Sequence, residues 1–243
     1  MFLVQKEGEI AMLAGRRNET NRAEWLEKTL AKIPPGARIL DAGAGELQFK
    51  KFCSHLKYVA QDFAEYNGKG DGSGLQPGDW DQTRLDIICD ICNIPEPDKS
   101  FDAILCVEVF EHLPNPLAAI KEFSRLLRVG GHLILTAPFC SFTHMSPFHF
   151  YAGFNRYFYE KHLPEQGFEI VEIEKNGNYF EFIAQEIWRI KYMANRYAGK
   201  SPNPLEMFAM MIMLRMLGRF SKADTGSSEI LCYGYHVLAR KQR

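Results

Sequence analysis

Buried strands and amphipathic helices alternate along residues 37–140, and this alternation limits the chain to very few folds. The expected strands are short apolar runs at 37–40, 58–63, 85–91, 101–109 and 132–139. Strands that are separated by helices pair in parallel, with right-handed crossovers. Two later runs, 168–175 and 232–241, complete the set. We therefore predict an α/β fold, a doubly wound, mostly parallel seven-stranded sheet with helices on both faces.

Helix signals fill the spaces between these runs. Asn18 offers an N-cap for a helix that ends before Pro34, and Asn115-Pro116 starts another in the same way. Residues 46–56 and 155–163 also have helical spacing. Where a crossover helix is expected after the second strand, the chain instead has a glycine-rich loop, residues 67–80.

The length of 243 residues suits one domain with an embellishment. We predict a single domain, 1–243, with a helical insertion before the last strand. Its expected parts are an N-terminal helical segment, a cofactor-binding core, the insertion and the last strand, at 1–36, 37–180, 181–225 and 226–243. The insertion contains a methionine cluster in 207–216. This cluster suggests either core packing or an adaptable surface for a lipid-like ligand or a partner, such as a second copy bound through 181–222.

Composition excludes several function classes. The formal net charge is −1, which gives no support for binding nucleic acid, and no apolar run reaches the length of a membrane span. The start of the chain lacks a signal-peptide pattern and six cysteines are scattered, so we expect a cytoplasmic protein. Cys89 and Cys92 have the spacing of half a zinc site, but no second pair follows, so we predict no metal.

The segment ILDAGAGELQF, 39–49, is a strand that runs into a Gly-x-Gly turn. Such a turn lets the backbone approach a ligand closely. Asp41, Asp62 and Asp90 lie at the ends of three successive strands, where ligands of doubly wound sheets bind. A carboxylate after the second strand can accept both hydroxyls of a ribose. Together these features favour a ligand with an adenosyl group.

The chain resembles the class I (seven-stranded, Rossmann-like) S-adenosylmethionine-dependent methyltransferases, especially the branch that acts on small molecules. ILDAGAG is similar to the glycine-rich first motif of that family and QDF to its acidic second motif. The stretch from CDICNIP to GGHLILTAPF is similar to the family from the third strand through the fifth, and its run FDAILCVEVFEHL…LLRVGGHLIL is specific to the family in combination. The resemblance covers about residues 37–140 and implies S-adenosyl-L-methionine as the cofactor.

Carried over onto this sequence, the resemblance implies a role for each of nine residues. Asp41, Gly43 and Gly45 would surround the methionyl part, and Asp62 would hold the ribose. The others would contact the adenine or line the floor near the sulfonium: Phe63, Asp90 and Ile91 for the adenine, Cys106 and Glu108 for the floor.

The loop after the fifth strand, where an acceptor meets the donor, is rich in histidine and aromatic residues. His144 and His149 are the candidates for a general base, with Tyr151 as an orienting group and His112 as a weaker candidate. The aromatic side chains suggest a flat or sugar-like acceptor, or simply local packing. We expect methyl transfer to an oxygen or nitrogen of a small molecule, and the resemblance suggests a sugar or secondary metabolite.

Two alternatives remain open from the sequence. Tyr157 and Lys161 have the Tyr-x-x-x-Lys spacing of NAD(P)-dependent oxidoreductases, although Gln48 stands where a third glycine of the dinucleotide fingerprint would be. A non-catalytic scaffold that binds an adenosyl ligand is the other alternative, and the intact aspartates weigh against it.

Overall fold

The computed structural model describes residues 14–243, which divide into two compact units. One unit contains the sheet and comprises Ala23–Glu174 and Gly234–Arg243. The other is helical and comprises the described residues up to Arg22 together with Lys175–Tyr233. The predicted helical insertion, 181–225, falls within the helical unit. Each unit is described by itself below.

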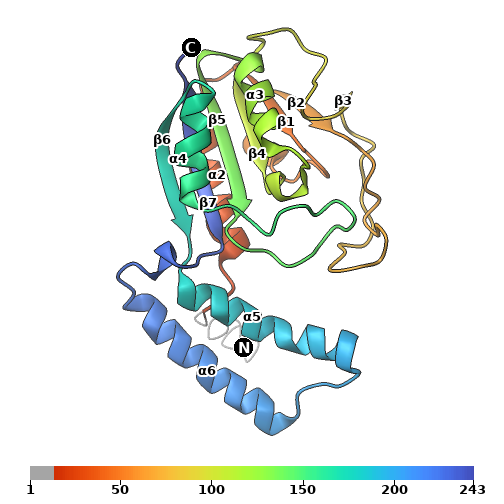
Figure 1. Ribbon diagram of the computed structural model, residues 1–243, viewed down its shortest axis with the longest axis vertical. Coiled ribbons are helices and arrows are strands. Elements are labelled where there is room, and N and C mark those ends of the chain that lie inside the picture. The colour runs from red at the N-terminus through yellow and green to blue at the C-terminus, as the bar shows by residue number, and fades with distance from the viewer. Residues whose placement is uncertain (1–13) are drawn as a thin grey trace. The chain divides into compact units, whose positions relative to one another are not determined.

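A seven-stranded sheet has the order β3-β2-β1-β4-β5-β7-β6 (Figure 1). Its strands are β1 Arg38–Ala42, β2 Lys57–Asp62, β3 Ile87–Ile88, β4 Phe101–Val107, β5 Leu127–Pro138, β6 Phe168–Asn176 and β7 Gly234–Lys241. The first five pair in parallel, and β7 pairs antiparallel with β5. This arrangement confirms the predicted fold class and puts the ends of β1, β2 and β4 at one edge.

Helices cover both faces of the sheet. In Figure 1, α3 (Pro116–Leu126) and α4 (Arg156–Glu165) lie in front of the strands, and α2 (Asn18–Leu30) lies behind them. The Asn115 side chain accepts from the Ala118 N–H at 3.1 Å, so it caps α3 as predicted. Phe110 and Phe123 stack with ring centroids 6.4 Å apart, which joins α3 to the chain after β4.

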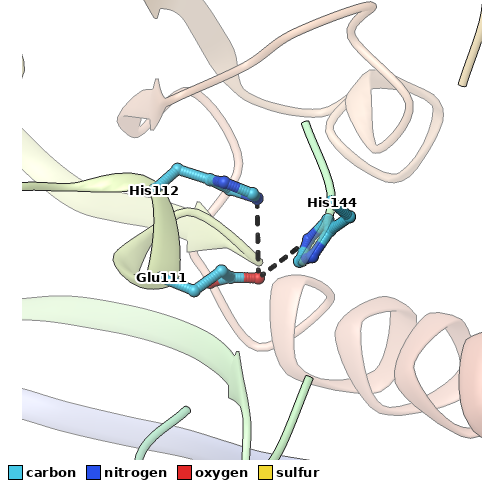
Figure 2. A group of neighbouring side chains, drawn as sticks. All are labelled: Glu111, His112 and His144. Carbon is cyan, nitrogen blue, oxygen red and sulfur yellow. Dashed lines mark ion pairs between the residues drawn. The ribbon is translucent and has the colours of Figure 1, made fainter. Parts of the chain in front are cut away.

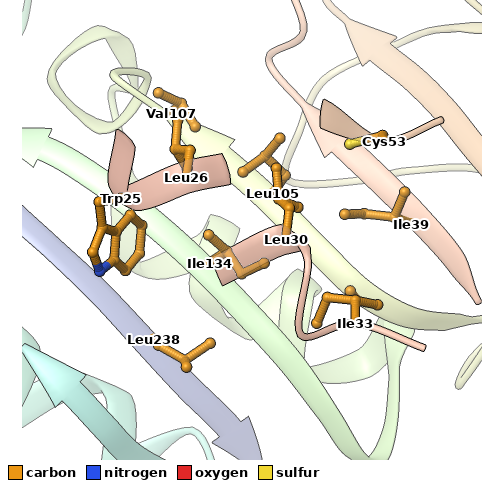
Figure 3. Packing of buried hydrophobic residues seen from close by; sticks show 11 residues of the cluster. Trp25, Leu26, Leu30, Ile33, Ile39, Cys53, Leu105, Val107, Ile134 and Leu238 are labelled. Carbon is orange, nitrogen blue, oxygen red and sulfur yellow. The ribbon is translucent and has the colours of Figure 1, made fainter. Parts of the chain in front are cut away.

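The main core lies between α2 and the strands (Figure 3). Trp25, Leu26 and Leu30 from α2 pack against Leu105 of β4 and Ile134 of β5, and all five are at most 5% exposed. Burying side chains of this size stabilises the fold by roughly 1.5–3 kcal/mol each. This core packs against the central strands, and the ends of those strands carry the candidate site.

Two sequence-based predictions in this unit are wrong. Residues 46–56 do not form an α-helix, and only the short 3-10 helix Lys50–Phe52 is present there. Leu47 has a φ of 62°, which interrupts any helix that starts at the glycine turn. The strand predicted at 85–91 shrinks to β3, because only its residues 87 and 88 pair with β2. The glycine-rich loop 67–80 contains no helix, as predicted.

The helical unit contains α5 (Tyr179–Met193), which continues as a π-helix over Ala194–Ala198, and α6 (Pro204–Lys222). Ala184 and Ile187 of α5 pack against Leu214 and Leu217 of α6. The methionines of α6 differ in burial. Met210 and Met211 pack against this cluster, whereas Met213 and Met216 are 46% and 38% exposed. Dimerisation through this region stays a prediction. Within the described residues, the helices are too short or too polar to cross a membrane.

Candidate active site

The glycine turn after β1 brings its backbone against β2 and against two side chains. Gly43 and Gly45 have φ values of 78° and 48°, in the left-handed region. The Gly43 N–H donates to the carbonyl oxygen of Gln61 at 2.9 Å. A Cβ on Gly43 would lie 2.5 Å from Val109, and one on Gly45 would lie 2.8 Å from the Trp80 ring. Both the conformation and the space therefore favour glycine at these positions.

Asp62 connects the end of β2 to the glycine turn. The side chain is buried, and its Oδ2 atom accepts from the Gly45 N–H at 2.9 Å. Its Oδ1 atom accepts from the Ala64 N–H at 3.1 Å and from the Gln82 amide at 3.3 Å. A carboxylate that is held by backbone donors in this way has a fixed orientation.

Asp41 is a second buried carboxyl group at the same edge. It is 2% exposed and accepts a short hydrogen bond from the Tyr58 hydroxyl. Burial raises the pKa of Asp41 to about 7, the Tyr58 hydrogen bond opposes this shift, and the negative charge of Asp62 adds to it. At neutral pH, Asp41 is therefore close to half ionised, so a cationic ligand group beside it would complete its ionisation.

The residues predicted to contact adenine have different environments. Phe63 is 36% exposed, and its ring meets the edge of Phe148 at a centroid distance of 5.0 Å. Asp90 is exposed and accepts from the Cys92 N–H at 2.8 Å, whereas Ile91 is 5% exposed. The exposed Phe63 ring and Asp90 carboxylate are available to a ligand, and their adenine contacts stay a prediction.

Cys106 and Glu108 lie at the end of β4. Cys106 is fully buried, and burial and nearby carboxylates raise the pKa of its thiol well above the ordinary value, so the thiol stays protonated. Glu108 has a φ of 54°, unusual for a residue other than glycine, and its Oε1 atom accepts from the Thr136 hydroxyl at 2.8 Å. Cys106 thus lies beneath the surface of the site, and Glu108 is fixed beside it.

The glycine-rich loop pairs with the loop after β5. Leu75 donates to the Thr143 carbonyl oxygen at 3.0 Å, and Met145 donates to that of Leu75 at 2.9 Å. A Cβ on Gly70 would lie 1.8 Å from the carbonyl oxygen of Ser146. The glycines allow the two backbones to approach, and this pairing holds the segment that carries His144.

Three histidines and a carboxyl group meet at the edge beyond β4 and β5. Glu111 and His112 belong to the 3-10 helix Phe110–His112, and His144 and His149 come from the loop after β5. The ring centroid of His144 lies 4.6 Å from that of His112 and 4.8 Å from that of His149. Both predicted base candidates therefore lie together, and His112 joins them.

Burial determines the charge of His112 and His149 in this cluster. It lowers the pKa of His112 to about 3, with a further lowering by His144. It also lowers the pKa of His149, again with a contribution from His144. Both imidazoles are therefore neutral at pH 7 and carry a lone pair.

The hydrogen bonds of His149 identify its basic nitrogen. The Ser141 hydroxyl donates to the Ala152 carbonyl oxygen at 3.1 Å and lies 3.1 Å from His149 Nε2. Because this hydroxyl has a single proton, we assign the Nε2 proton to His149 and the lone pair to its Nδ1 atom. The Tyr151 hydroxyl donates instead to the Pro114 carbonyl oxygen at 3.3 Å. The hydroxyl group that contacts the His149 ring is therefore that of Ser141.

The dehydrogenase alternative rests on a pair at the surface of α4. Tyr157 is 62% exposed, and Lys161 forms an exposed ion pair with Glu165 at 2.7 Å. Both side chains therefore belong to the exposed surface of α4.

Sequence reasoning missed several residues at this edge. Glu111 directly precedes His112 after β4, a local signal that the sequence does show. Tyr58, Trp80, Gln82 and Ser141 have no such signal, because their roles depend on contacts with distant residues.

The two buried carboxyl groups fit the polar parts of S-adenosylmethionine. Asp41, with its raised pKa, suits the methionyl ammonium, and Asp62 suits the ribose hydroxyls. A ribose hydroxyl at Asp62 Oδ1 would replace the Gln82 amide, whose hydrogen bond there is long. The donor set is therefore compatible with the cofactor that the sequence predicts.

A family comparison identifies residues 40–135 as matching a model described as "Methyltransferase domain". A curated relative, the ubiquinone biosynthesis O-methyltransferase of Xanthomonas axonopodis pv. citri, is 34% identical over 115 residues. The alignment covers 46% of this chain and 47% of the relative, so the chain spans about half the length of the curated relatives it matches.

Solved structures with a similar fold are more distant in sequence. A putative sarcosine dimethylglycine methyltransferase from Galdieria sulphuraria has a TM-score of 0.57 at 18% identity, over 93% of this chain and 88% of that one. A phosphoethanolamine N-methyltransferase from Haemonchus contortus, in complex with S-adenosyl-L-methionine, has a TM-score of 0.54 at 16% identity, over 92% and 53%. At these identities the likeness establishes the fold.

Proposed function

Because the chain carries a class I S-adenosylmethionine-dependent methyltransferase domain, we propose that it transfers the methyl group of S-adenosylmethionine to a hydroxyl oxygen of a small molecule. The observation that carries the proposal is the shared edge of the sheet. The carboxyl groups Asp41 and Asp62 lie in the last two residues of β1 and β2, and the base candidate His149 lies in the loop after β5.

When bound, S-adenosylmethionine supplies an electrophilic methyl group on a positively charged sulfur. Asp62 would orient the ribose and Asp41 the methionyl group, which would present the methyl group to the acceptor oxygen. His149 takes the hydroxyl proton on its Nδ1 atom, while Ser141 fixes the ring through Nε2. The neutral state of His149 at pH 7 supports this role.

The side chains around the histidines support a flat, hydroxylated acceptor. Phe142, Phe150 and Tyr151 are 45%, 48% and 39% exposed, and Phe63 contributes a partly exposed ring. Aromatic faces of this kind stack on planar rings and shield them from water. We favour oxygen over nitrogen because the similar Xanthomonas protein is named an O-methyltransferase. A phenolic secondary metabolite is thus a better candidate than a sugar.

Calorimetric titration with S-adenosylhomocysteine tests the cofactor site. We expect the wild-type chain to bind it with micromolar affinity, and NAD to bind much more weakly. Asp62→Ala should weaken the binding about tenfold or more, since a charge-assisted hydrogen bond contributes roughly 1.5–3 kcal/mol. Asp98→Ala is the matched control, because Asp98 precedes β4 at the opposite end of the strand and pairs with Arg125. Equal affinity for both variants and the wild type would contradict the assignment.

A transfer assay with labelled methyl donor and a panel of phenols, sugars and amines tests the reaction. His149→Ala should lower kcat by roughly 10²–10⁴-fold and leave the affinity for S-adenosylhomocysteine unchanged. His162→Ala, on α4, should retain full activity. If the cofactor binds but no acceptor of any class is methylated, the non-catalytic alternative is favoured instead.

A further inference from the structure

Glu111, His112 and His144 form a cluster whose ligand atoms converge on one point (Figure 2). Within residues 14–243, this is the group of histidine, cysteine and acidic side chains that could hold a metal ion. Oε1 of Glu111 lies 3.8 Å from Nε2 of His112 and 4.0 Å from Nε2 of His144, and the ligand atoms all lie within 4.8 Å of one another.

Both histidines are oriented by the backbone. The Nδ1 atom of His112 lies 2.6 Å from the Phe148 carbonyl oxygen, and that of His144 lies 2.8 Å from the Phe142 carbonyl oxygen. A carbonyl oxygen can only accept, so each Nδ1 atom carries the proton and each Nε2 atom carries the lone pair. Metal-binding histidines have this arrangement, in which the second ring nitrogen donates to a carbonyl or carboxylate and fixes the ring.

We propose that Glu111, His112 and His144 bind a divalent transition-metal cation of the Zn²⁺ type. Two imidazole nitrogens and one carboxylate oxygen match the ligand set of catalytic zinc sites, which keep a further position open. Nitrogen donors favour such a cation over Mg²⁺ or Ca²⁺, which prefer oxygen. Metal–ligand distances of about 2.0–2.2 Å place tetrahedral ligands roughly 3.3–3.6 Å apart. The separations between the ligand atoms, which are at most 4.8 Å, would therefore need to shorten by up to about 1.5 Å.

The surrounding backbone keeps the three ligands in place. The N–H groups of Phe150 and Tyr151 donate to the Glu111 carbonyl oxygen at 2.9 and 3.2 Å, which ties the loop after β5 to the 3-10 helix. The pairing of Leu75 with Thr143 and Met145 holds His144 from the other side. Backbone hydrogen bonds therefore hold the segments that carry the proposed site, and Glu111 is 1% exposed.

The open position suggests a role that rests on the proposed function. A hydroxyl oxygen of the acceptor that binds the cation becomes more acidic. Its proton passes to Nδ1 of His149, whose ring lies beside that of His144. The oxygen then attacks the methyl carbon, and the electron pair of the broken carbon–sulfur bond stays on the sulfur.

The test uses the full chain, treated with a chelator and titrated with Co²⁺ while the visible absorption is followed. We expect one Co²⁺ per chain, with the intense d–d bands of a four- or five-coordinate ion, and its displacement by Zn²⁺. His144→Ala and Glu111→Gln should each weaken binding about tenfold or more. His162→Ala is the matched control, because His162 lies outside the cluster and pairs with Glu165.

His144→Ala decides the outcome if Glu111→Gln does not fold, because His144 lies on a loop and its side chain is 27% exposed. Absence of saturable Co²⁺ binding by the wild type, or binding that His144→Ala leaves unchanged, overturns the metal site. The affinity for S-adenosylhomocysteine is measured on the same samples. Loss of metal binding alone refutes only this inference, whereas loss of cofactor binding with the metal retained refutes only the proposed function.

Discussion

The buried carboxyl group of Asp41 makes the stability of this protein depend on pH in a predictable direction. Its folded-state pKa is about 7, against about 3.8 for an ordinary aspartate. Below pH 3.8 the carboxyl group is protonated in both the folded and the unfolded state, and the contribution of Asp41 to stability is fully present. Between pH 3.8 and 7 the unfolded state releases its proton first, so the free energy of unfolding falls as pH rises.

The magnitude follows from this difference in pKa. Each pH unit in the window costs about 1.4 kcal/mol, so the Asp41 contribution falls by up to about 4 kcal/mol by pH 7 and is constant above it. Asp41→Asn removes the titrating group and keeps an oxygen that can accept from Tyr58. The free energy of unfolding of Asp41→Asn should therefore rise relative to that of the wild type as pH rises. Tyr58→Phe should extend the pH range of this effect upward, because the Tyr58 hydrogen bond lowers the pKa of Asp41.

Urea unfolding followed by circular dichroism from pH 4.5 to 8.5 measures this effect. The informative quantity is the difference in unfolding free energy between Asp41→Asn and the wild type, since other titrating groups cancel. Asp79→Asn is the control, because the Asp79 side chain is fully exposed. A difference for Asp41→Asn that varies by less than about 0.5 kcal/mol across this range would refute the reasoning.

Three further predictions follow from the same edge of the sheet. The affinity for S-adenosylhomocysteine should rise about fivefold from pH 6 to pH 7, because the ammonium group of the ligand needs ionised Asp41. This rise should be absent in Asp41→Asn. A pH-independent affinity in the wild type would contradict the placement of the ammonium group beside Asp41. Gly70→Ala should destabilise the fold by about 1–3 kcal/mol more than Gly72→Ala, because a Cβ atom would meet the Ser146 carbonyl oxygen only at Gly70. Thermal unfolding of the two variants measures this difference. Phe123→Ala, which removes a fully buried side chain beside Phe110, should lower the free energy of unfolding in urea by about 3–5 kcal/mol. A loss below 1 kcal/mol would show that neighbouring side chains fill the cavity.

Local patterns in the sequence determined the elements whose boundaries depend on nearby residues. Alternation of apolar runs predicted β1, β2, β4 and β5, and the Asn115-Pro116 pair predicted the start of α3. These signals act within a few residues, where backbone geometry and capping decide the conformation. The helix predicted at 46–56 fails because the chain at Leu47 adopts a left-handed conformation that its helical spacing does not reveal.

Tertiary structure alone decided how the site is assembled. The sequence places Asp41, Asp62, His144 and His149 near strand ends, but it contains no signal for the pairing of the glycine-rich loop with the loop after β5. That pairing joins residues about 70 positions apart and brings His144 to Glu111 and His112. It depends on hydrogen bonds and close backbone approach in three dimensions. Burial raises the pKa of Asp41, and contacts between distant segments bring the histidines together; both exist only in the folded chain.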